Sequence, residues 1–358
     1  MSHLFKNIKW SAFTVGHFLL LSVLVACNRN PKVAESLALT GDAMGTNYHI
    51  KVVTDQFELV QLQSSVDSIL NLFNGAVSTY DTNSIISRFN ANTIHFDSFK
   101  SKANNQELTQ LEQFLKVCYR SFDVYTASGG AFDPGAGPIY KAWGFAEQKI
   151  FKVPTQAYID SCLVFAKYNQ LELLDGIPVK KDPRLALNFN AIAKGYGVDV
   201  IADYLEELGI ENYMVEIGGE VRCKGKNSKN EFWTIGINVP SSSAKPDDAQ
   251  AVLQIKNRSL ATSGNYRQYF EENGKKYAHT IDPRTGYPAK NELLSASILA
   301  NDCMTADAYA TACMVLGKNK CLDLIKKDTT LDVFLLFNDE KGEVQSVYSH
   351  RIAELLLK

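Results

Sequence analysis

The sequence predicts an α+β fold, in which one domain combines mixed or antiparallel sheets with flanking helices. Some stretches place apolar residues at helical spacing and others alternate apolar and polar residues as strands do. The strands between residues 233 and 299 follow one another without intervening helices, which favours α+β over a doubly wound fold. The 358 residues allow one large domain or two intertwined lobes, with an ample core. The net charge of −2 offers no basic surface, so we expect no nucleic-acid partner.

The N-terminal segment, residues 1–26, is predicted to be a secretory signal peptide. Lys6 and Lys9 precede an apolar run over residues 18–26, and no acidic residue occurs before Glu35. The run is too short for a comfortable membrane-spanning helix. The alternative is an uncleaved anchor helix.

The run ends in Leu-Val-Ala-Cys, which resembles the lipobox of bacterial lipoproteins. In such signals the cysteine, here Cys27, is acylated and becomes the first residue of the mature chain. We therefore expect a lipidated tether over residues 27–37 and a folded domain over residues 38–358. Acyl chains on Cys27 would anchor the protein to the inner or outer membrane on its periplasmic side.

The N-terminal half of the domain is predicted to be mainly helical. Glycines and prolines interrupt residues 128–145, so we expect an ordered loop there. The predicted elements are, in order, a strand over residues 46–54, a helix over 57–73, a turn-rich stretch over 77–90, a helix over 106–122, the loop over 128–145 and a helix over 155–166.

The C-terminal half is predicted to be rich in strands. Gly218 and Gly219 break one strand, and Asn273-Gly274 is a favoured two-residue hairpin turn. The predicted elements are a strand over 185–189, a helix over 191–208, strands over 212–223, 233–239, 251–255 and 259–262, a hairpin over 266–271 and 276–281, a strand over 293–299, helices over 303–316 and 319–327, and strands over 331–337 and 344–348.

Cysteine and histidine patterns do not favour a zinc site and leave disulfides open. Among the six cysteines after residue 27 no Cys-x-x-Cys pair occurs, and the spacing names no disulfide, so buried free thiols are expected. No two histidines share a short motif. The six cysteines are Cys118, Cys162, Cys223, Cys303, Cys313 and Cys321.

The segment His279 to Pro288 concentrates chemically active side chains on a stiffened loop. His279, Asp282 and Arg284 lie within six residues, beside two prolines and a glycine that restrict the backbone. An imidazole suits proton transfer and a guanidinium suits a phosphate. The alternative for Asp282 is a simple turn cap.

Two later residues suit a magnesium ion. Asp307 and Thr311 lie four apart on a predicted helix, so their oxygens share one face. Hard oxygen ligands of this kind are typical of magnesium sites. The alternative for Thr311 is a hydrogen bond to its own helix backbone.

Other candidate binding residues are scattered along the chain. Lys194 lies near a helix N-terminus, where amides favour an anion; the alternative is a solvated helix residue. Gly218 and Gly219 permit a ligand to approach the backbone. No Walker loop, no Gly-x-Gly-x-x-Gly after a strand and no Gly-x-Ser-x-Gly elbow is present, so a charged ligand must be held in another way.

Eight motifs occur in one order and together resemble a known family, the ApbE family of FAD:protein FMN transferases. The resemblance covers residues 40–337 and implies a single ApbE-type, T-fold-like catalytic domain that binds FAD in a central cleft. The motifs are AMGT, Ser-x-Tyr at 78–80, GGAFDPGAGP, IAKGYGVD, IGGEVRCKG, ATSGNYRQYF, YAHTIDPRTGYP and ADAYAT.

The resemblance implies a reaction and roles for individual residues. FMN would move from FAD to a serine or threonine hydroxyl of an acceptor protein, releasing AMP, with magnesium bridging the phosphates. His279 would be the catalytic base, and Asp282 would orient it or assist the metal. The metal ligands would be Ala191 through its carbonyl, Asp307 and Thr311. The FAD contacts would come from Met44, Tyr80, Ala131, Phe132, Asp133, Asn188, Lys194, Gly218, Gly219, Thr262, Ser263, His279, Ile281 and Arg284.

One departure and two alternatives remain at this point. Asn188-Phe189-Asn190-Ala191 replaces the family's Asp-Leu-Gly-Gly, which could alter an adenine contact or weaken metal affinity. The resemblance names exported domains of membrane redox complexes as acceptors, such as sodium-pumping NADH:quinone oxidoreductases (Nqr) or Rnf-type complexes. The alternatives are a magnesium-dependent FAD pyrophosphatase and a non-enzymatic FAD-binding lipoprotein.

Overall fold

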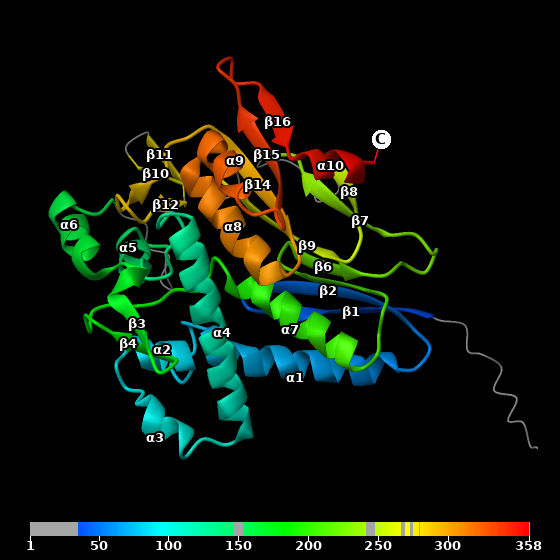
Figure 1. Cartoon of the computed structure of the whole chain (residues 1–358), viewed down its shortest axis with the longest axis horizontal. Helices are drawn as coiled ribbons and strands as arrows, with labels where there is room; N and C mark the ends of the chain where they lie inside the picture. The colour runs from blue at the N-terminus through cyan, green and yellow to red at the C-terminus, as the bar shows by residue number, and fades with distance from the viewer. Residues whose placement is uncertain are drawn as a thin grey trace, which may run out of the picture. The chain divides into compact units, whose positions relative to one another are not determined.

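An antiparallel sheet of eight strands forms the framework of the protein (Figure 1). The computed structural model describes residues 35–145, 153–240, 248–265, 269–272, 275–278 and 280–357. Each neighbouring pair in the sheet runs antiparallel, which confirms the α+β prediction. The strand order is β1 (Glu35–Ala43), β2 (Thr46–Thr54), β5 (Tyr213–Ile217), β6 (Glu220–Lys224), β9 (Arg258–Gly264), β14 (Leu293–Ala300), β15 (Asp332–Asn338) and β16 (Val344–Tyr348).

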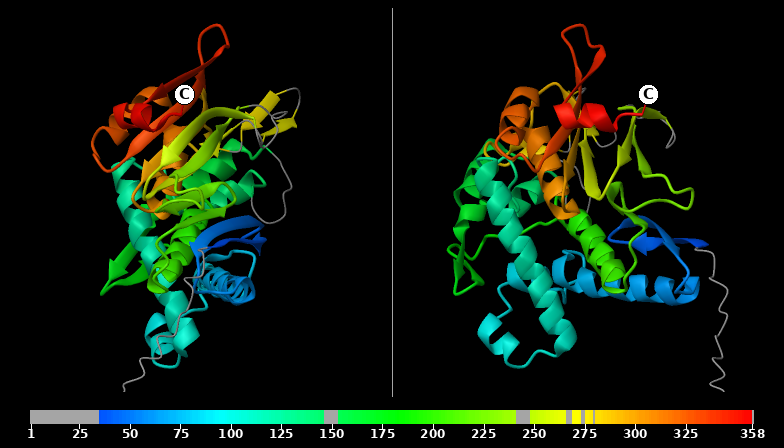
Figure 2. Two further views of the ribbon diagram at one scale, coloured as in Figure 1. Left: turned by 90° about the vertical axis from the view of Figure 1, so that its right-hand side faces the viewer. Right: turned by 45° about the vertical axis from the view of Figure 1, so that its right-hand side comes forward.

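Helices cover one face of this sheet. In Figure 2, α7 (Ala193–Glu207) and α8 (Cys303–Leu316) lie along the strands, with α4 (Asn105–Ala127) beyond them. Helix α1 (Leu59–Val77) packs against β1, β2 and α7 through residues such as Leu62 and Val66. Twelve of the fourteen residues of α8 are buried, because it lies between the sheet and the outer helices.

A smaller layer covers the other face of the sheet. It consists of the ribbon of β7 (Trp233–Asn238) and β8 (Ala249–Ile255) and the short helix α10 (His350–Leu355). Along β15, Val333 and Leu335 point into the core under the helices, whereas Phe334 and Leu336 point into the core under this layer. Strand β14 and most of β15 are therefore buried on both faces.

The remaining elements surround this framework. The antiparallel pairing of β10 with β11 confirms the predicted hairpin arms, whereas its turn, Asn273-Gly274, lies outside the described residues. These elements are α2 (Ile85–Asn90), α3 (Phe96–Lys100), α5 (Gly137–Ala142), α6 (Gln156–Phe165), α9 (Lys318–Ile325), β3 (Leu171–Leu174), β4 (Ile177–Lys180), β10 (Tyr269–Glu272), β11 (Lys275–Ala278), β12 (Ile281–Asp282) and β13 (Tyr287–Pro288).

The ordered fold begins earlier than predicted. Strand β1 pairs with β2 from Glu35 onward, so it occupies the last residues of the segment 27–37 that the sequence assigns to a tether. Cys27 and the predicted signal peptide lie outside the described residues. In the part of the chain that the structure describes, we find no helix with the length and apolar character needed to cross a membrane.

Three local predictions are corrected. The turn-rich stretch 77–90 contains the helix α2, and the predicted loop 128–145 contains the helix α5. Residues 185–189 do not form the predicted strand. The backbone N–H of Leu187 donates to Oδ1 of Asn90 (2.7 Å), and its carbonyl accepts from Nδ2 of Asn90 (2.9 Å). One asparagine side chain thus satisfies groups that a neighbouring strand would otherwise satisfy.

The cysteines differ from the expectation at one pair. Cys118, Cys162, Cys223 and Cys303 are buried free thiols, as predicted. Cys313 and Cys321 form a disulfide that joins the end of α8 to α9. The separation of eight residues did not reveal this pair, because only the sharp turn between the two helices brings the two α-carbons to 4.8 Å.

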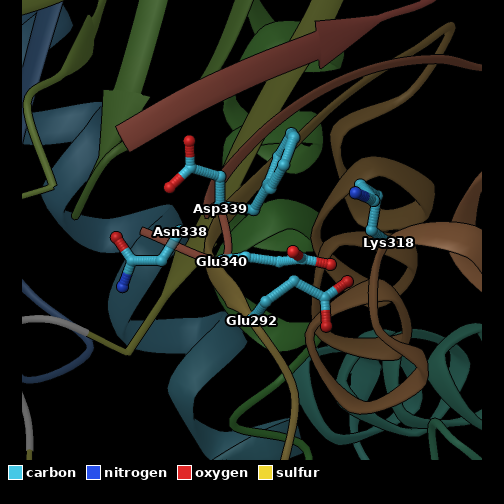
Figure 3. A pocket seen from close by; sticks show the side chains of 6 residues that line it. Glu292, Lys318, Asn338, Asp339 and Glu340 are labelled. Atoms are coloured by element: carbon cyan, nitrogen blue, oxygen red, sulfur yellow. The ribbon is translucent and has the colours of Figure 1, made fainter. Parts of the chain in front are cut away.

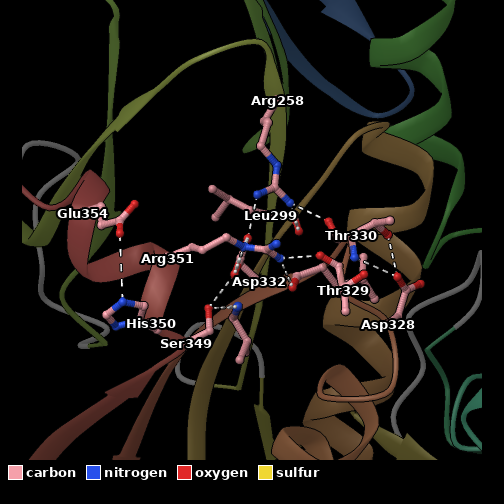
Figure 4. A network of polar contacts seen from close by, with 12 residues as sticks. Arg258, Leu299, Asp328, Thr329, Thr330, Asp332, Ser349, His350, Arg351 and Glu354 are labelled. Carbon is pink, nitrogen blue, oxygen red and sulfur yellow. Dashed lines mark hydrogen bonds and ion pairs between the residues drawn. The ribbon is translucent and has the colours of Figure 1, made fainter.

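A buried carboxylate fastens the C-terminal helix to the sheet (Figure 4). Asp332, the first residue of β15, accepts hydrogen bonds from Arg258 (2.6 Å), Arg351 (3.0 Å) and Ser349 (2.8 Å). Burial alone would raise the pKa of Asp332, but the hydrogen bonds from Arg351, Arg258 and Ser349 outweigh it and lower that pKa. Strand β9, strand β15 and α10 are therefore joined through one charge.

Replacement of Asp332 by asparagine is expected to lower the free energy of unfolding by about 2 kcal/mol at pH 7, because two partly exposed arginines lose their shared partner. A depressed pKa stabilises the fold above the unfolded value of about 3.9 and loses that effect as the pH falls through the folded value. Urea unfolding at several pH values should therefore show that the difference in free energy of unfolding between wild type and variant becomes smaller below about pH 4. The exposed Asp323→Asn of α9 is the control, and a difference independent of pH would contradict the prediction.

Candidate functional site

Asp307 is an ionisable residue within a buried helix. It lies in the middle of α8 and is 3% exposed. Its Oδ2 accepts a hydrogen bond from the backbone N–H of Gly195 (3.0 Å), and no other donor from the described residues engages this carboxylate. Its Oδ1 accepts no hydrogen bond from a described residue and can therefore bind a further partner. A cation at Oδ1 would supply that partner.

The sequence lets α7 and α8 approach closely at this point. A Cβ at Gly195 would lie 2.3 Å from the carbonyl oxygen of Cys303 and 2.8 Å from Cβ of Asp307, so only glycine fits. The start of α8 is fixed by Asp199 of α7, whose two oxygens accept the N–H groups of Cys303 (2.9 Å) and Met304 (2.8 Å). Burial raises the pKa of Asp199 to about 7.

Lys194 precedes Gly195 and extends toward the sheet. Its Nζ lies 2.6 Å from Oε1 of Glu220, the first residue of β6. Burial would lower the pKa of Lys194, but the negative charges of Asp307 and Glu220 outweigh this effect and raise it. Lys194 therefore stays cationic and remains 30% exposed, as a phosphate contact requires.

Two adjacent glycines form the turn next to Lys194. Gly218 has φ +61°, and a Cβ there would lie 2.8 Å from Cγ2 of Thr46 and 3.2 Å from Cδ of Lys194. Gly219 has φ +104° and donates its N–H to Glu216 (2.6 Å). The left-handed backbone of both residues explains why the strand predicted over 212–223 divides into β5 and β6 here.

Met44 and Thr311 border the same region. Met44 has φ +54° in the β1–β2 turn. A Cβ at Gly197 of α7 would lie 2.8 Å from the sulfur of Met44. Thr311 lies one turn beyond Asp307, and its Oγ1 is 3.3 Å from Oγ of Ser263. The neighbouring Thr262 instead shares a hydrogen bond with Ser297 (2.7 Å). Ser263 therefore lies beside the helix face that carries Asp307, whereas Thr262 contacts β14.

A second group of predicted residues lies on loops. Oδ1 of Asp133 accepts the N–H groups of Gly135 (2.8 Å) and Tyr168 (2.9 Å), and burial raises its pKa to about 7. Arg284 pairs with both oxygens of Asp282, each at 2.8 Å. The carboxylate of Asp282 is therefore already occupied by its own loop, which favours the turn-forming alternative for this residue.

The two loops contact each other. A Cβ at Gly130 would lie 3.8 Å from Cγ of Arg284. Trp143, which follows the GGAFDPGAGP motif, donates its indole N–H to the carbonyl of Gly286 (2.8 Å). Ala131, Phe132 and Ile281 are 1% exposed, so their side chains support the loops from beneath.

Of the remaining predicted residues, Asn188 joins the loop of Asp133, because its backbone N–H donates to the carbonyl of Pro134 (2.8 Å). Tyr80 is 63% exposed on the turn after α1. Oδ1 of Asn188 accepts the N–H of Asn190 (2.9 Å). The turn that contains Ala191, just before α7, is closed by the N–H of Ile192, which donates to the carbonyl of Phe189 (3.0 Å). The predicted base His279 lies outside the described residues, but Thr280 after it is held by Asn265 (2.5 Å).

Two surface hollows differ in their relation to these residues. One, of about 490 Å³, lies at the Met44 turn and is lined by Asp42, Ala43, Met44, Gly45, Thr46, Asn47 and Asn74. Another, of about 400 Å³, lies between α9 and the β15–β16 turn (Figure 3). Its lining contains none of the predicted site residues, so only the first hollow adjoins the candidate site. The second is lined by Glu292, Lys318, Phe337, Asn338, Asp339 and Glu340.

The donor set fits a hard divalent cation. Asp307 supplies a buried carboxylate oxygen, Thr311 a hydroxyl on the same helix face, and the turn at Ala191 lies directly before α7. Among the described residues no group of three histidine, cysteine, aspartate or glutamate side chains could hold a metal. A single carboxylate supplemented by neutral oxygens is suited to magnesium, which retains waters and binds substrate phosphates.

Sequence reasoning missed Glu220. The motif IGGEVRCKG drew attention to its glycines, although Glu220, Arg222 and Lys224 alternate along β6 and therefore share one face. All three pair with α7: Glu220 with Lys194, Arg222 with Asp199 and Glu206, and Lys224 with Glu206. The alternation of charges was the available signal.

Comparisons with known proteins agree with this architecture. A model of the ApbE family matches residues 44–335. The chain is 36% identical over 329 residues to an FAD:protein FMN transferase of Haemophilus influenzae, covering 90% of this chain and 91% of the relative. It is 38% identical over 326 residues to an FAD:protein FMN transferase of Vibrio cholerae, covering 90% and 92%. The solved flavin transferase ApbE from Vibrio cholerae has a TM-score of 0.77 at 34% identity, covering 90% and 100%.

The fold and these relatives define a transferase. The chain belongs to the ApbE family.

Proposed function

We propose that this protein transfers FMN from FAD to a serine or threonine hydroxyl of an acceptor protein and releases AMP. The single observation that carries the proposal is the convergence of Lys194, Asp307, Thr311 and Ser263 from three different elements. A cation, a buried carboxylate and two hydroxyls suit a pyrophosphate and its counter-ion. The names of the relatives support FAD as the flavin donor.

The bonds exchanged in this reaction define what the residues must do. The acceptor oxygen bonds to the phosphorus of the FMN half, and the bond from that phosphorus to the bridging oxygen breaks, so that AMP leaves with the bridging oxygen. The hydroxyl proton passes to a base, for which we propose His279. Lys194 would neutralise phosphate charge, and the flexible thioether of Met44 would pack against the flavin.

We propose that magnesium is held by Asp307, Thr311 and the carbonyl of Ala191. When bound, it supplies charge neutralisation at the phosphates. The residues of this chain prepare that arrangement: Gly195 orients the Asp307 carboxylate through its N–H, and Ser263 holds the Thr311 hydroxyl.

Incubation of the purified protein with FAD and magnesium, with and without an acceptor domain, tests the proposal. Mass spectrometry of the acceptor is expected to show one added FMN on a threonine or serine, with AMP released in equal amount. Release of free FMN without labelling of the acceptor would refute the transfer and indicate an FAD pyrophosphatase. Unchanged FAD would refute it and indicate a flavin-binding protein without enzymatic activity. Omission of magnesium is the control and should abolish labelling.

We further propose that the protein acts as a lipoprotein anchored through Cys27 on the periplasmic side, on exported domains of Nqr-like or Rnf-like redox complexes. The lipobox-like sequence at residues 24–27 supports the anchor. Replacement of Cys27 by serine is expected to release the protein from the membrane fraction. Retention of the serine variant in that fraction would refute the lipid anchor.

A further inference from the structure

Glu220 is a buried carboxylate that the proposed chemistry leaves without a role. It is 3% exposed and follows directly after the Gly218–Gly219 turn. Its Oε1 holds Nζ of Lys194 at 2.6 Å, and its Oε2 is buried without a hydrogen-bond partner among the described residues. Burying an incompletely paired carboxylate is costly, and a hydrophobic residue at this position would avoid that cost.

Charged side chains of β6 pair with oppositely charged side chains of α7 in a row, which we call the charge ladder. Within this ladder, the sign of the charge on each element changes at Glu220. At the C-terminal ends of the two elements, β6 supplies the cations Arg222 and Lys224, and α7 supplies carboxylates such as Glu206. Next to the candidate metal site, the strand supplies the carboxylate Glu220 and the helix supplies the cation Lys194. Lys194 is therefore the cation that α7 supplies to these pairs, and it directly precedes Gly195, whose N–H donates to Asp307.

Lys194 has two carboxylates within electrostatic reach but pairs with only one. The charges of both Asp307 and Glu220 act on it, whereas its ion pair within the described residues is with Glu220. Gly218 borders the methylene stem of Lys194, since a Cβ there would lie 3.2 Å from Cδ. The stem is thus guided past the glycine turn to Glu220, and Oδ1 of Asp307 remains without a hydrogen bond from any described residue.

An ammonium group bound to Asp307 would compete with a divalent cation for the same oxygen. We propose that Glu220 is a positioning residue, which holds the Lys194 ammonium away from Asp307 and so keeps the Asp307 carboxylate available to magnesium. This inference rests on the metal site of the proposed function. Glu220 itself touches neither the metal nor the substrate in this proposal.

The test measures metal binding directly, with Mn²⁺ as the probe and electron paramagnetic resonance as the readout. Glu220→Gln and Glu220→Asp are each expected to raise the Mn²⁺ dissociation constant about tenfold, the size of coupling found within one ion-pair network. Glu220→Asp is the decisive variant, because it keeps the negative charge and only withdraws it from Lys194. If Glu220→Asp bound Mn²⁺ with wild-type affinity, the inference would be overturned, because the negative charge of residue 220 would then suffice without its contact with Lys194.

A second substitution tests whether the effect passes through Lys194. In the double variant Glu220→Asp with Lys194→Met, no ammonium competes for Asp307, and Mn²⁺ affinity is expected to return to within about threefold of wild type. Persisting weak binding would overturn the inference. Glu206→Gln, which removes a carboxylate from a Lys–Glu pair in the same ladder, is the matched control and should leave Mn²⁺ affinity unchanged.

Failure of this inference and failure of the proposed function give different results. If the wild-type protein binds no Mn²⁺, the metal site itself is refuted. If the wild-type protein binds Mn²⁺ and Asp307→Asn does not, while both Glu220 variants bind as wild type does, the metal site stands and only the role of Glu220 is refuted. Thermal unfolding of each variant verifies that the fold is retained.

Discussion

Replacement of Asp307 by asparagine is expected to reduce flavin transfer by at least about a thousandfold. Asparagine retains an oxygen that can accept the N–H of Gly195, so the contact between α7 and α8 should survive. The variant loses the negative charge at the centre of the proposed magnesium site, where no second carboxylate of α8 can replace it. The measurement is the initial rate of acceptor labelling at saturating FAD and magnesium.

The matched control for this variant is the residue that caps the same helix. Asp302 caps α8 by accepting the N–H of Thr305 (2.8 Å), and asparagine caps helices equally well. Asp302→Asn should therefore label the acceptor within about twofold of the wild-type rate. Transfer by Asp307→Asn within tenfold of wild type would exclude Asp307 as a metal ligand.

Replacement of His279 by alanine is expected to reduce transfer by about a thousandfold or more while leaving FAD affinity within about twofold of wild type, because a general base contributes chiefly to the chemical step. FAD affinity is followed by flavin fluorescence, and transfer by mass spectrometry of the acceptor. His350, which is exposed on α10, provides the control, since His350→Ala should leave both quantities unchanged. Normal transfer by His279→Ala would remove the histidine from the mechanism.

The sequence predicted most of the fold because long periodic patterns determine most of it. The strand over residues 46–54 appears with those bounds, and the helices of residues 191–208 and 303–316 appear as α7 and α8. The prediction failed where partners distant in the chain decide the structure. Residues 185–189 look like a strand, but the side chain of Asn90 takes the place of a neighbouring strand, and local periodicity cannot show this.

The site was predicted less completely than the fold. The family motifs named Lys194, Asp307 and Thr311, and the structure brings these residues together with Ser263 and Gly218. The sequence left two roles open for Asp282, because its pairing with Arg284 becomes visible only in the folded loop. Glu220 was missed because its importance comes from a lysine on a different element, a contact that only the folded chain creates.

The strand order of the central sheet has a consequence for biosynthesis. Strand β2 pairs with β5, so that Tyr48 faces Ile217, and β9 pairs with β14 later in the chain. Pairings between segments so far apart form slowly, because chain entropy is lost before contacts compensate for it. The residues that would handle the flavin come from positions 44 to 311, so a nascent chain holds no complete site until synthesis has passed α8. The proposed site would therefore become complete in one late step, after the segments that carry Met44 and Thr311 have both been made.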